Sequence, residues 1–257
     1  MAMLATEDAI NETCPWSGKP VQPDALTTYR DLPVGFCNPG CRDQFDAAVA
    51  HFEAASRHLP APPTLRQMAG ATPIPARLAD AVLVVIDAQG AYRDGALALP
   101  DMASALPTLA ALLARARQAG MPVIHVAHRG PAGGLFDRAG PGGAILPEAA
   151  PQAGEHVVEK SLPNAFAGTD LQARLLQTGR PNLLLAGFMT HMCVSSTARA
   201  AIDLRWPVTV VADATATRML PDPLGGPPIP APQVQRAALA ALADRFAVVA
   251  PAAAIGA

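Results

Sequence analysis

Three side chains of complementary chemistry each follow a short aliphatic run in this chain. Asp87 ends the run "AVLVVID", Lys160 ends "HVVEK", and Cys193 follows "LLLAGFMTHM". A cysteine thiol is a nucleophile, a carboxylate can accept and return its proton, and a lysine cation favours the thiolate form. Free N–H groups at a strand-to-helix turn can also hold a developing oxyanion. These residue types together fit acyl transfer through a thioester.

Each of these residues, taken alone, also has a plainer interpretation. Asp87 fits a turn or a helix cap, Lys160 fits an exposed lysine, and Cys193 fits a small buried residue. The chemical interpretation therefore depends on the three side chains meeting in space. A thiol at the start of a helix lies near the positive end of the helix dipole, so we expect the pKa of Cys193 to be lowered.

The pattern of elements after residue 78 indicates how these side chains would be positioned. Short aliphatic runs alternate with helical patterns, which predicts an α/β fold with a parallel sheet covered by helices on both faces, in a Rossmann-like three-layer arrangement. In such sheets, ligands bind beyond the carboxyl ends of the strands. The predicted strands lie within 81–89, 121–128, 156–160, 182–187, 207–213 and 247–250, and the predicted helices within 103–120, 169–179, 193–205 and 230–246.

Further polar residues follow the same strands and are candidates for contact with a substrate. Gln89 would orient the acid or touch substrate, and Thr190 would support the turn through hydrogen bonds. Two Pro/Gly-rich loops, 129–147 and 219–232, are candidate pocket walls or lids. The candidate substrate-binding residues are Gln89, His128, Arg129, Thr190 and His191.

Three sequence blocks resemble the isochorismatase-like cysteine hydrolase superfamily. They are "LVVIDAQGAY", "VVEKSLPNAFAGTDL" and "LLLAGFMTHMCVSSTARAAIDLRWPVTVVADATAT", and they occur in the family's order over about residues 78–250. The resemblance implies that Asp87 is the general acid and base, that Lys160 is the charge partner that lowers the thiol pKa, and that Cys193 is the nucleophile.

The same resemblance implies the geometry of the turn before the nucleophile. Members of the family carry a cis peptide that does not involve proline, which corresponds to Phe188–Met189 in this chain. The backbone amides of Met189 and Cys193 would then form the oxyanion hole.

The implied reaction is hydrolysis of a C–N bond other than a peptide bond, in a small amide, lactam or carbamoyl compound, through a Cys193 thioester and without a catalytic cofactor. Isochorismatase proper lacks the cysteine, and the nicotinamidase metal-binding histidines are absent from "GAYRDGALALPDM". Two alternatives stay open. One is a metal- or redox-responsive binding protein with a hydrolase-like fold, and the other is hydrolysis by Asp87 and Lys160 without the thiol.

The N-terminal segment carries the other three cysteines, spaced Cys14-x22-Cys37-x3-Cys41. A Cys-x3-Cys pair before a helix, with a third cysteine on an earlier loop, can supply three thiolates of a tetrahedral zinc site. The segment resembles the small TRASH/YHS type of metal-binding module, and we expect a structural zinc. The fourth ligand is not evident, and His51, Asp24, water or another chain could provide it.

Composition and charge define the organisation and exclude several classes of function. We predict a cysteine-rich module over 1–58, a Pro/Ala linker without helical or strand period over 59–77, and a hydrolase domain over 78–257. A net charge of −2 without a basic run argues against a nucleic-acid partner, and the apolar runs are too short to cross a membrane. The acidic start is unlike a secretory signal, and the grouping of the cysteines fits reduced thiols. We therefore expect a cytoplasmic homo-oligomer that acts on a small amide-type substrate.

Overall fold

The computed structural model describes residues 4–30, 32–56 and 61–256, and the chain forms two compact units that divide between Pro62 and Pro63. The predicted boundary between module and linker, at residues 58 and 59, lies outside the described residues. The second unit has the predicted α/β fold with a parallel sheet, so the fold class is confirmed.

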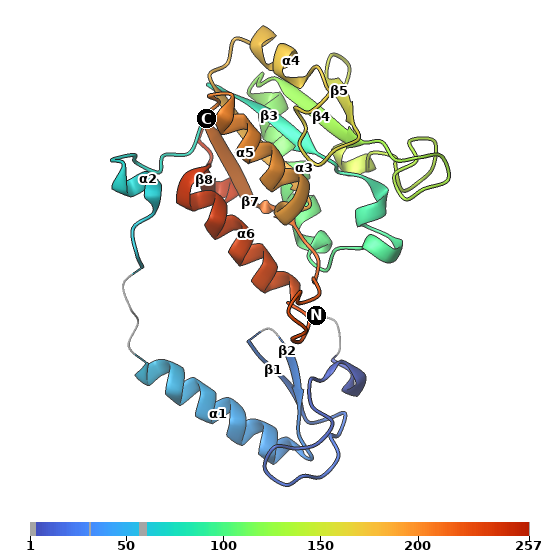
Figure 1. Cartoon of the computed structure of the whole chain (residues 1–257), viewed down its shortest axis with the longest axis vertical. Helices are drawn as coiled ribbons and strands as arrows, with labels where there is room; N and C mark the ends of the chain where they lie inside the picture. Colours follow the sequence, from blue (N-terminus) through green and yellow to red (C-terminus); the bar gives the residue numbers. More distant parts are fainter. Residues whose placement is uncertain (1–3, 31, 57–60, 257) are drawn as a thin grey trace. The chain divides into compact units, whose positions relative to one another are not determined.

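The N-terminal unit is built around a small hairpin and one helix (Figure 1). Strands β1 (Leu26–Tyr29) and β2 (Leu32–Gly35) pair antiparallel, and helix α1 (Pro39–Ala55) follows. The Asn38 side chain caps α1 by accepting a hydrogen bond from the Cys41 amide at 3.0 Å. The apolar core of this unit is small, and its buried members are Cys14, Ala25, Val34 and Phe36.

The C-terminal unit contains a six-stranded sheet with the order β5-β4-β3-β6-β7-β8, in which every neighbouring pair is parallel. All the carboxyl ends of the strands therefore lie at one edge. The central strand β3 is buried along its whole length, as its unbroken aliphatic sequence requires. The strands are β3 (Ala81–Ile86), β4 (Val123–His128), β5 (His156–Lys160), β6 (Asn182–Phe188), β7 (Val208–Ala216) and β8 (Val248–Ala250).

Helices cover both faces of this sheet because its apolar residues alternate between two cores. Leu83 and Val85 pack on the face that carries α3, whereas Val82, Val84 and Ile86 pack on the face that carries α4, α5 and α6. Full burial of one such branched side chain contributes about 1.5–3 kcal/mol. The helices are α2 (Leu65–Met68), α3 (Met102–Gln118), α4 (Leu171–Gln177), α5 (Ser195–Asp203) and α6 (Ala231–Arg245).

The predicted linker is not free of structure where it is described. Helix α2 lies within it, and the Leu65 amide donates a hydrogen bond to Asp244 of α6 at 2.9 Å. Further on, the Ala76 amide donates to Thr209 Oγ1 of β7 at 3.0 Å. These bonds join distant parts of the sequence, so composition alone did not indicate them.

Strand β7 continues beyond Asp213, where the sequence pattern predicted its end, and reaches Ala216. The pairing of β6 with β7 shifts register between Leu185 and Gly187, which accommodates the extra length. Gly187 has a φ of +113°, and a Cβ at this position would lie 2.0 Å from the carbonyl oxygen of Ile86. Only glycine allows this close approach of β3 and β6 next to the functional edge.

In the part of the chain that the structure describes, every helix is too short or too polar to cross a lipid bilayer.

Candidate active site

Asp87 lies at the carboxyl end of the central strand. It follows Ile86 directly, and its amide donates a hydrogen bond to the carbonyl of Val126 in β4 at 2.9 Å. Its φ of +48° is left-handed, a conformation that aspartate adopts more readily than most residues. This turn directs the chain out of the sheet and leaves the Asp87 side chain fully buried.

Lys160 and Cys193 reach the same point from strands on either side of β3. Lys160 is the last residue of β5, and its Nζ lies 2.7 Å from Oδ2 of Asp87. The same Nζ donates to Sγ of Cys193 at 3.3 Å. Lys160 is 2 % exposed and Cys193 is 5 % exposed, so water is largely absent around the pair of charges and the thiol. The structure therefore brings a thiol, a carboxyl group and a lysine amine into one buried cluster.

Cys193 lies within a wide helical turn, Thr190–Val194, that precedes α5. The sequence pattern instead placed Cys193 at the start of the helix. The hydroxyl of Thr190 donates to the carbonyl of Ala216 at 3.1 Å and so ties this turn to the end of β7. The Phe188–Met189 peptide just before the turn is cis.

The pKa of the thiol is shifted opposite to the expected direction. Burial, and then the negative charge of Asp87, raise the pKa of Cys193 to about 12, although the Lys160 cation opposes them. Burial also raises the pKa of Asp87, against the opposing effect of Lys160 and of hydrogen bonds from Lys160 and Cys193. The resting thiol is therefore protonated, and it stands beside a carboxylate that is more basic than an exposed one.

Gln89 is fully buried, and its side chain is hydrogen-bonded to backbone groups of two other segments. Its Nε2 donates to the carbonyls of His128 at 2.9 Å and Gly143 at 2.7 Å, and its Oε1 accepts from the His128 amide at 2.8 Å. Gln89 thus fixes the end of β4 and the loop 129–147 beside Asp87.

His128 and Arg129 follow the same strand but have different surroundings. Nδ1 of His128 lies 3.3 Å from Nζ of Lys160, and burial together with the Lys160 charge lowers the pKa of His128. His128 is therefore neutral at physiological pH and can accept a hydrogen bond from Lys160. The Arg129 side chain is 66 % exposed and lies 3.7 Å from Glu159.

His191 lies in the Thr190–Val194 turn, two residues before Cys193. Its Nδ1 is hydrogen-bonded to the hydroxyl of Thr217. Among the described residues, His191 Nε2 and Arg218 Nε are both buried without a hydrogen-bond partner. The sequence pattern did not identify Arg218, because the predicted strand ended at Asp213. In the structure β7 ends at Ala216 and places Arg218 at the functional edge.

The sequence pattern also did not identify Tyr92, because a single aromatic residue after a strand does not by itself indicate a functional site. Burial, and then the charges of Asp87 and Cys193, raise the pKa of its hydroxyl, which places Tyr92 near the cluster. Its ring is 5.3 Å from that of Phe136 and 6.2 Å from that of Phe188, measured between centroids.

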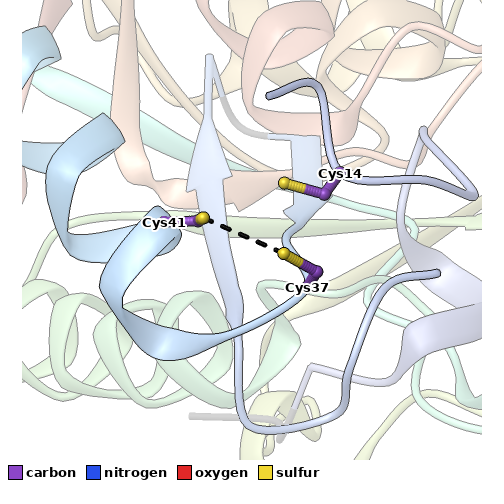
Figure 2. A group of neighbouring side chains, drawn as sticks. All are labelled: Cys14, Cys37 and Cys41. Carbon is purple, nitrogen blue, oxygen red and sulfur yellow. Dashed lines mark hydrogen bonds between the residues drawn. The ribbon is translucent and has the colours of Figure 1, made fainter. Parts of the chain in front are cut away.

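The N-terminal unit holds the second candidate site. The sulfur atoms of Cys14, Cys37 and Cys41 all lie within 4.8 Å of one another and point into a common space (Figure 2). Sγ of Cys37 is 3.9 Å from that of Cys41, and it accepts a hydrogen bond from the Ser17 hydroxyl at 3.0 Å. Nδ2 of Asn38 donates to both of these sulfurs, at 3.2 and 3.4 Å. Three thiols so close together could serve as ligands of one soft or borderline metal ion.

Comparison with known proteins gives consistent matches over the second unit. The isochorismatase domain matches residues 81–254. The secreted isochorismatase effector Isc1 of Verticillium dahliae is 39 % identical over 184 residues, which are 71 % of this chain and 94 % of that protein. A streptothricin hydrolase of Streptomyces noursei is 38 % identical over 174 residues, 67 % of this chain and 63 % of the relative.

Solved structures agree with these matches. The crystal structure of an isochorismatase from Pseudomonas putida KT2440 superposes with a TM-score of 0.73 at 44 % identity, covering 76 % of this chain and 100 % of that one. The fold, the domain match and the relatives all point to one family, and the chain is therefore a hydrolase of the isochorismatase family.

Proposed function

We propose that this protein is a cysteine hydrolase that cleaves a C–N bond, other than a peptide bond, in a small amide, lactam or carbamoyl compound. The observation that carries this proposal is the buried cluster in which Nζ of Lys160 contacts both Asp87 and Cys193. The streptothricin hydrolase relative supports the assignment of a hydrolase. Isochorismatase-type hydrolysis by Asp87 and Lys160 without the thiol is the competing function.

The first half of the reaction forms a thioester. As Sγ of Cys193 attacks the substrate carbonyl carbon, the thiol proton passes to Asp87, whose raised pKa makes it a suitable acceptor. The carbonyl π electrons move to oxygen, and we propose that the amides of Met189 and Cys193 stabilise this oxyanion. When the oxyanion collapses, the C–N bond breaks and Asp87 returns its proton to the departing nitrogen.

The second half restores the enzyme. Asp87, again a carboxylate, takes a proton from water as the water oxygen attacks the thioester carbon. The C–S bond breaks, the carboxylic acid product leaves, and the sulfur regains a proton. Lys160 stabilises the negative charge that alternates between the carboxylate and the sulfur.

The remaining candidate residues have supporting roles in this proposal. Gln89 and Thr190 hold the backbone on either side of the cluster, as their hydrogen bonds indicate. His128 would contact substrate, because it contacts Lys160 and is only partly buried. His191 would also contact substrate, since it is only partly buried and lies two residues before Cys193. Arg129 is the candidate with the weakest support, since its side chain faces solvent and pairs with Glu159.

Turnover of an amide panel tests the proposal. We expect the purified protein to release ammonia or amine from at least one primary amide or carbamoyl compound, or to open the ring of at least one lactam. Acid quenching during turnover should leave the acyl group on the peptide that contains Cys193, detected as a mass increment. If a wide panel gives neither product nor acylated Cys193, the hydrolytic assignment of the thiol is wrong.

We further propose that Cys14, Cys37 and Cys41 hold a structural zinc ion. The proximity of the three sulfurs supports this, because thiolates bound to one zinc lie about 2.3 Å from it. The resemblance of the segment to TRASH/YHS modules points the same way. The ion would fix the Cys14 loop to the start of α1 in a unit whose own apolar core is small.

Elemental analysis of protein purified under reducing conditions without chelator should find about one zinc per chain. Replacement of Cys41 by serine should remove most of it and lower the unfolding temperature of the N-terminal unit, with Cys193→Ser as the matched control that keeps its zinc. Absence of metal from the unmodified protein would contradict the zinc proposal and leave the hydrolase proposal untouched.

Two expectations about cellular context stay predictions of the sequence. They are assembly into a homo-oligomer and a cytoplasmic location, and the Verticillium dahliae relative is described as secreted.

A further inference from the structure

Asn38 uses both polar atoms of its side-chain amide at the start of α1. Its Oδ1 accepts a hydrogen bond from the Cys41 amide at 3.0 Å and caps the helix. Its Nδ2 donates to Sγ of Cys37 at 3.2 Å and to Sγ of Cys41 at 3.4 Å. The cap fixes the orientation of the side-chain amide, because a backbone N–H can only donate and therefore requires the oxygen. The nitrogen consequently faces the two sulfurs.

The two sulfurs that Asn38 contacts already lie at the spacing of metal ligands. They are 3.9 Å apart, and Sγ of Cys14 lies within 4.8 Å of both (Figure 2). Two thiolates bound at about 2.3 Å to one tetrahedral zinc ion lie about 3.8 Å from each other. Cys37 and Cys41 therefore need almost no movement to bind such an ion.

Two thiolates at this spacing repel each other, so the pair needs neighbouring groups that hold it together before an ion binds. Hydrogen bonds from N–H and O–H donors offset this repulsion, and they are roughly twice as strong to a charged acceptor as to a neutral one. The Ser17 hydroxyl donates to Cys37 alone, at 3.0 Å, whereas the Asn38 amide donates to both sulfurs. Asn38 is therefore the donor that bridges the pair.

We propose that Asn38 is a positioning residue of the metal site, which holds Cys37 and Cys41 together as a ligand pair and thereby raises the affinity for zinc. The inference rests on the proposed zinc site and is independent of the proposed hydrolase. Side chains that hydrogen-bond to metal ligands change the metal affinity by about 10- to 100-fold. Because the same amide caps α1, the start of the helix and the two ligands are held as one piece.

Replacement of Asn38 by serine separates the two tasks of the side chain. Serine caps a helix about as well as asparagine does. Its side chain is shorter and carries a single hydrogen, so it cannot donate to two sulfurs. We expect the dissociation constant of zinc to rise by about 10- to 100-fold in Asn38→Ser. The measurement is competition with a chromophoric chelator on the full chain under reducing conditions, and circular dichroism verifies that the helix content is kept.

Cobalt(II) in place of zinc reports directly on the hydrogen bonds to sulfur. Charge transfer from a thiolate to cobalt gives an absorption band in the near ultraviolet. An N–H or O–H donor withdraws electron density from the sulfur, so its loss should move this band to longer wavelength in Asn38→Ser. Ser17→Ala removes a donor to Cys37 without removing the helix cap and should move the band in the same direction.

Asn11→Ser is the matched control for the stability of the unit. The Asn11 side chain holds the end of β2, because its Nδ2 donates to the Gly35 carbonyl at 2.7 Å and its Oδ1 accepts from the Gly35 amide at 2.9 Å. All the hydrogen bonds given for this side chain within the described residues go to backbone groups and none to a sulfur. Asn11→Ser should therefore leave the cobalt band in place and change the zinc dissociation constant by less than about threefold.

The possible results distinguish the inference from the zinc proposal on which it rests. Weaker zinc binding by Asn38→Ser without a shift of the cobalt band would show that Asn38 is a helix cap only, which overturns the inference. Equal zinc binding by Asn38→Ser and the parent protein overturns it too, while the zinc proposal stands. A parent protein that binds neither zinc nor cobalt rejects the metal site and the inference together.

Discussion

Replacement of Cys193 by alanine is expected to reduce kcat/KM by about a thousandfold or more for every amide that the parent protein hydrolyses. The reason is that Sγ is the only nucleophile in the cluster, and Asp87 and Lys160 are already bound to each other at 2.7 Å. The measurement is steady-state hydrolysis of the best substrate from the amide panel, together with the mass of the acid-quenched protein, which should show no acyl group.

The controls for this variant separate loss of chemistry from loss of fold. Cys193→Ser keeps the size of the side chain and should also be inactive, because a hydroxyl gives up its proton far less readily than a thiol. Ser195→Ala changes a nearby buried residue that has no contact with Asp87 or Lys160 among the hydrogen bonds of the described chain, and it should stay active. Full activity of Cys193→Ala would instead favour hydrolysis without the thiol. An inactive parent protein with ordinary thiol reactivity would favour a binding protein.

The second large predicted effect is a loss of stability when the buried ion pair of Asp87 and Lys160 is broken. Asp87→Asn and Lys160→Met should each destabilise the C-terminal unit by about 3–5 kcal/mol, because each leaves the other charge buried without its partner. The double variant should recover much of that loss, since both charges are then absent. Urea unfolding, followed by the fluorescence of the buried Trp206 in a Trp16→Phe background, measures these free energies of unfolding.

Activity should not recover with stability. Each single variant is expected to lose about 10²- to 10⁴-fold in kcat/KM. Without the Asp87 carboxylate no group accepts the thiol proton, and without the Lys160 cation the pKa of Asp87 is raised further. The double variant should be as inactive as Asp87→Asn despite its restored stability. Recovery of both stability and activity in the double variant would show that the pair is structural only.

The pH dependence of the parent protein follows from the same pair. Asp87 must be ionised to accept the thiol proton, so activity is lost as pH falls through its pKa. Because burial raises that pKa above the ordinary value of about 3.9, the acid limb should lie above about pH 4. Lys160 opposes this rise, so whatever residual activity Lys160→Met keeps should have an acid limb at still higher pH. A shift of the limb to lower pH would contradict the assigned role of Lys160.

Much of this architecture was predictable because its signals are local. The strands that position Asp87 and Cys193 are short aliphatic runs, and a parallel sheet covered on both faces requires such runs. The strand that ends at Lys160 is more polar and partly exposed, and it lies at the edge of the sheet. The rule that ligands bind beyond the carboxyl ends of parallel strands then placed Asp87, Lys160 and Cys193 at one edge. Local pattern did not predict the docking of α2 on α6 through Asp244, because that contact joins distant residues. The helix itself does carry a local signal, the capping box of Thr64 and Gln67.

The unexpected parts of the site depend on interactions between distant segments. The register shift beside Gly187 lets β7 run past Asp213, and this alone brings Arg218 to the functional edge. Tyr92 enters the site through its packing between Phe136 and Phe188, which come from separate regions of the sequence.

The sequence by itself determined which chemical groups are present, the order of the strands along the chain and the edge at which the groups meet. Only the tertiary structure determined the direction in which the pKa of each group is shifted. The dipole of the helix that follows Cys193 favours a low thiol pKa, but burial and the Asp87 carboxylate raise it to about 12. The direction changes because a pKa sums desolvation and charge over the whole surroundings of a group, and here those surroundings come from three different strands.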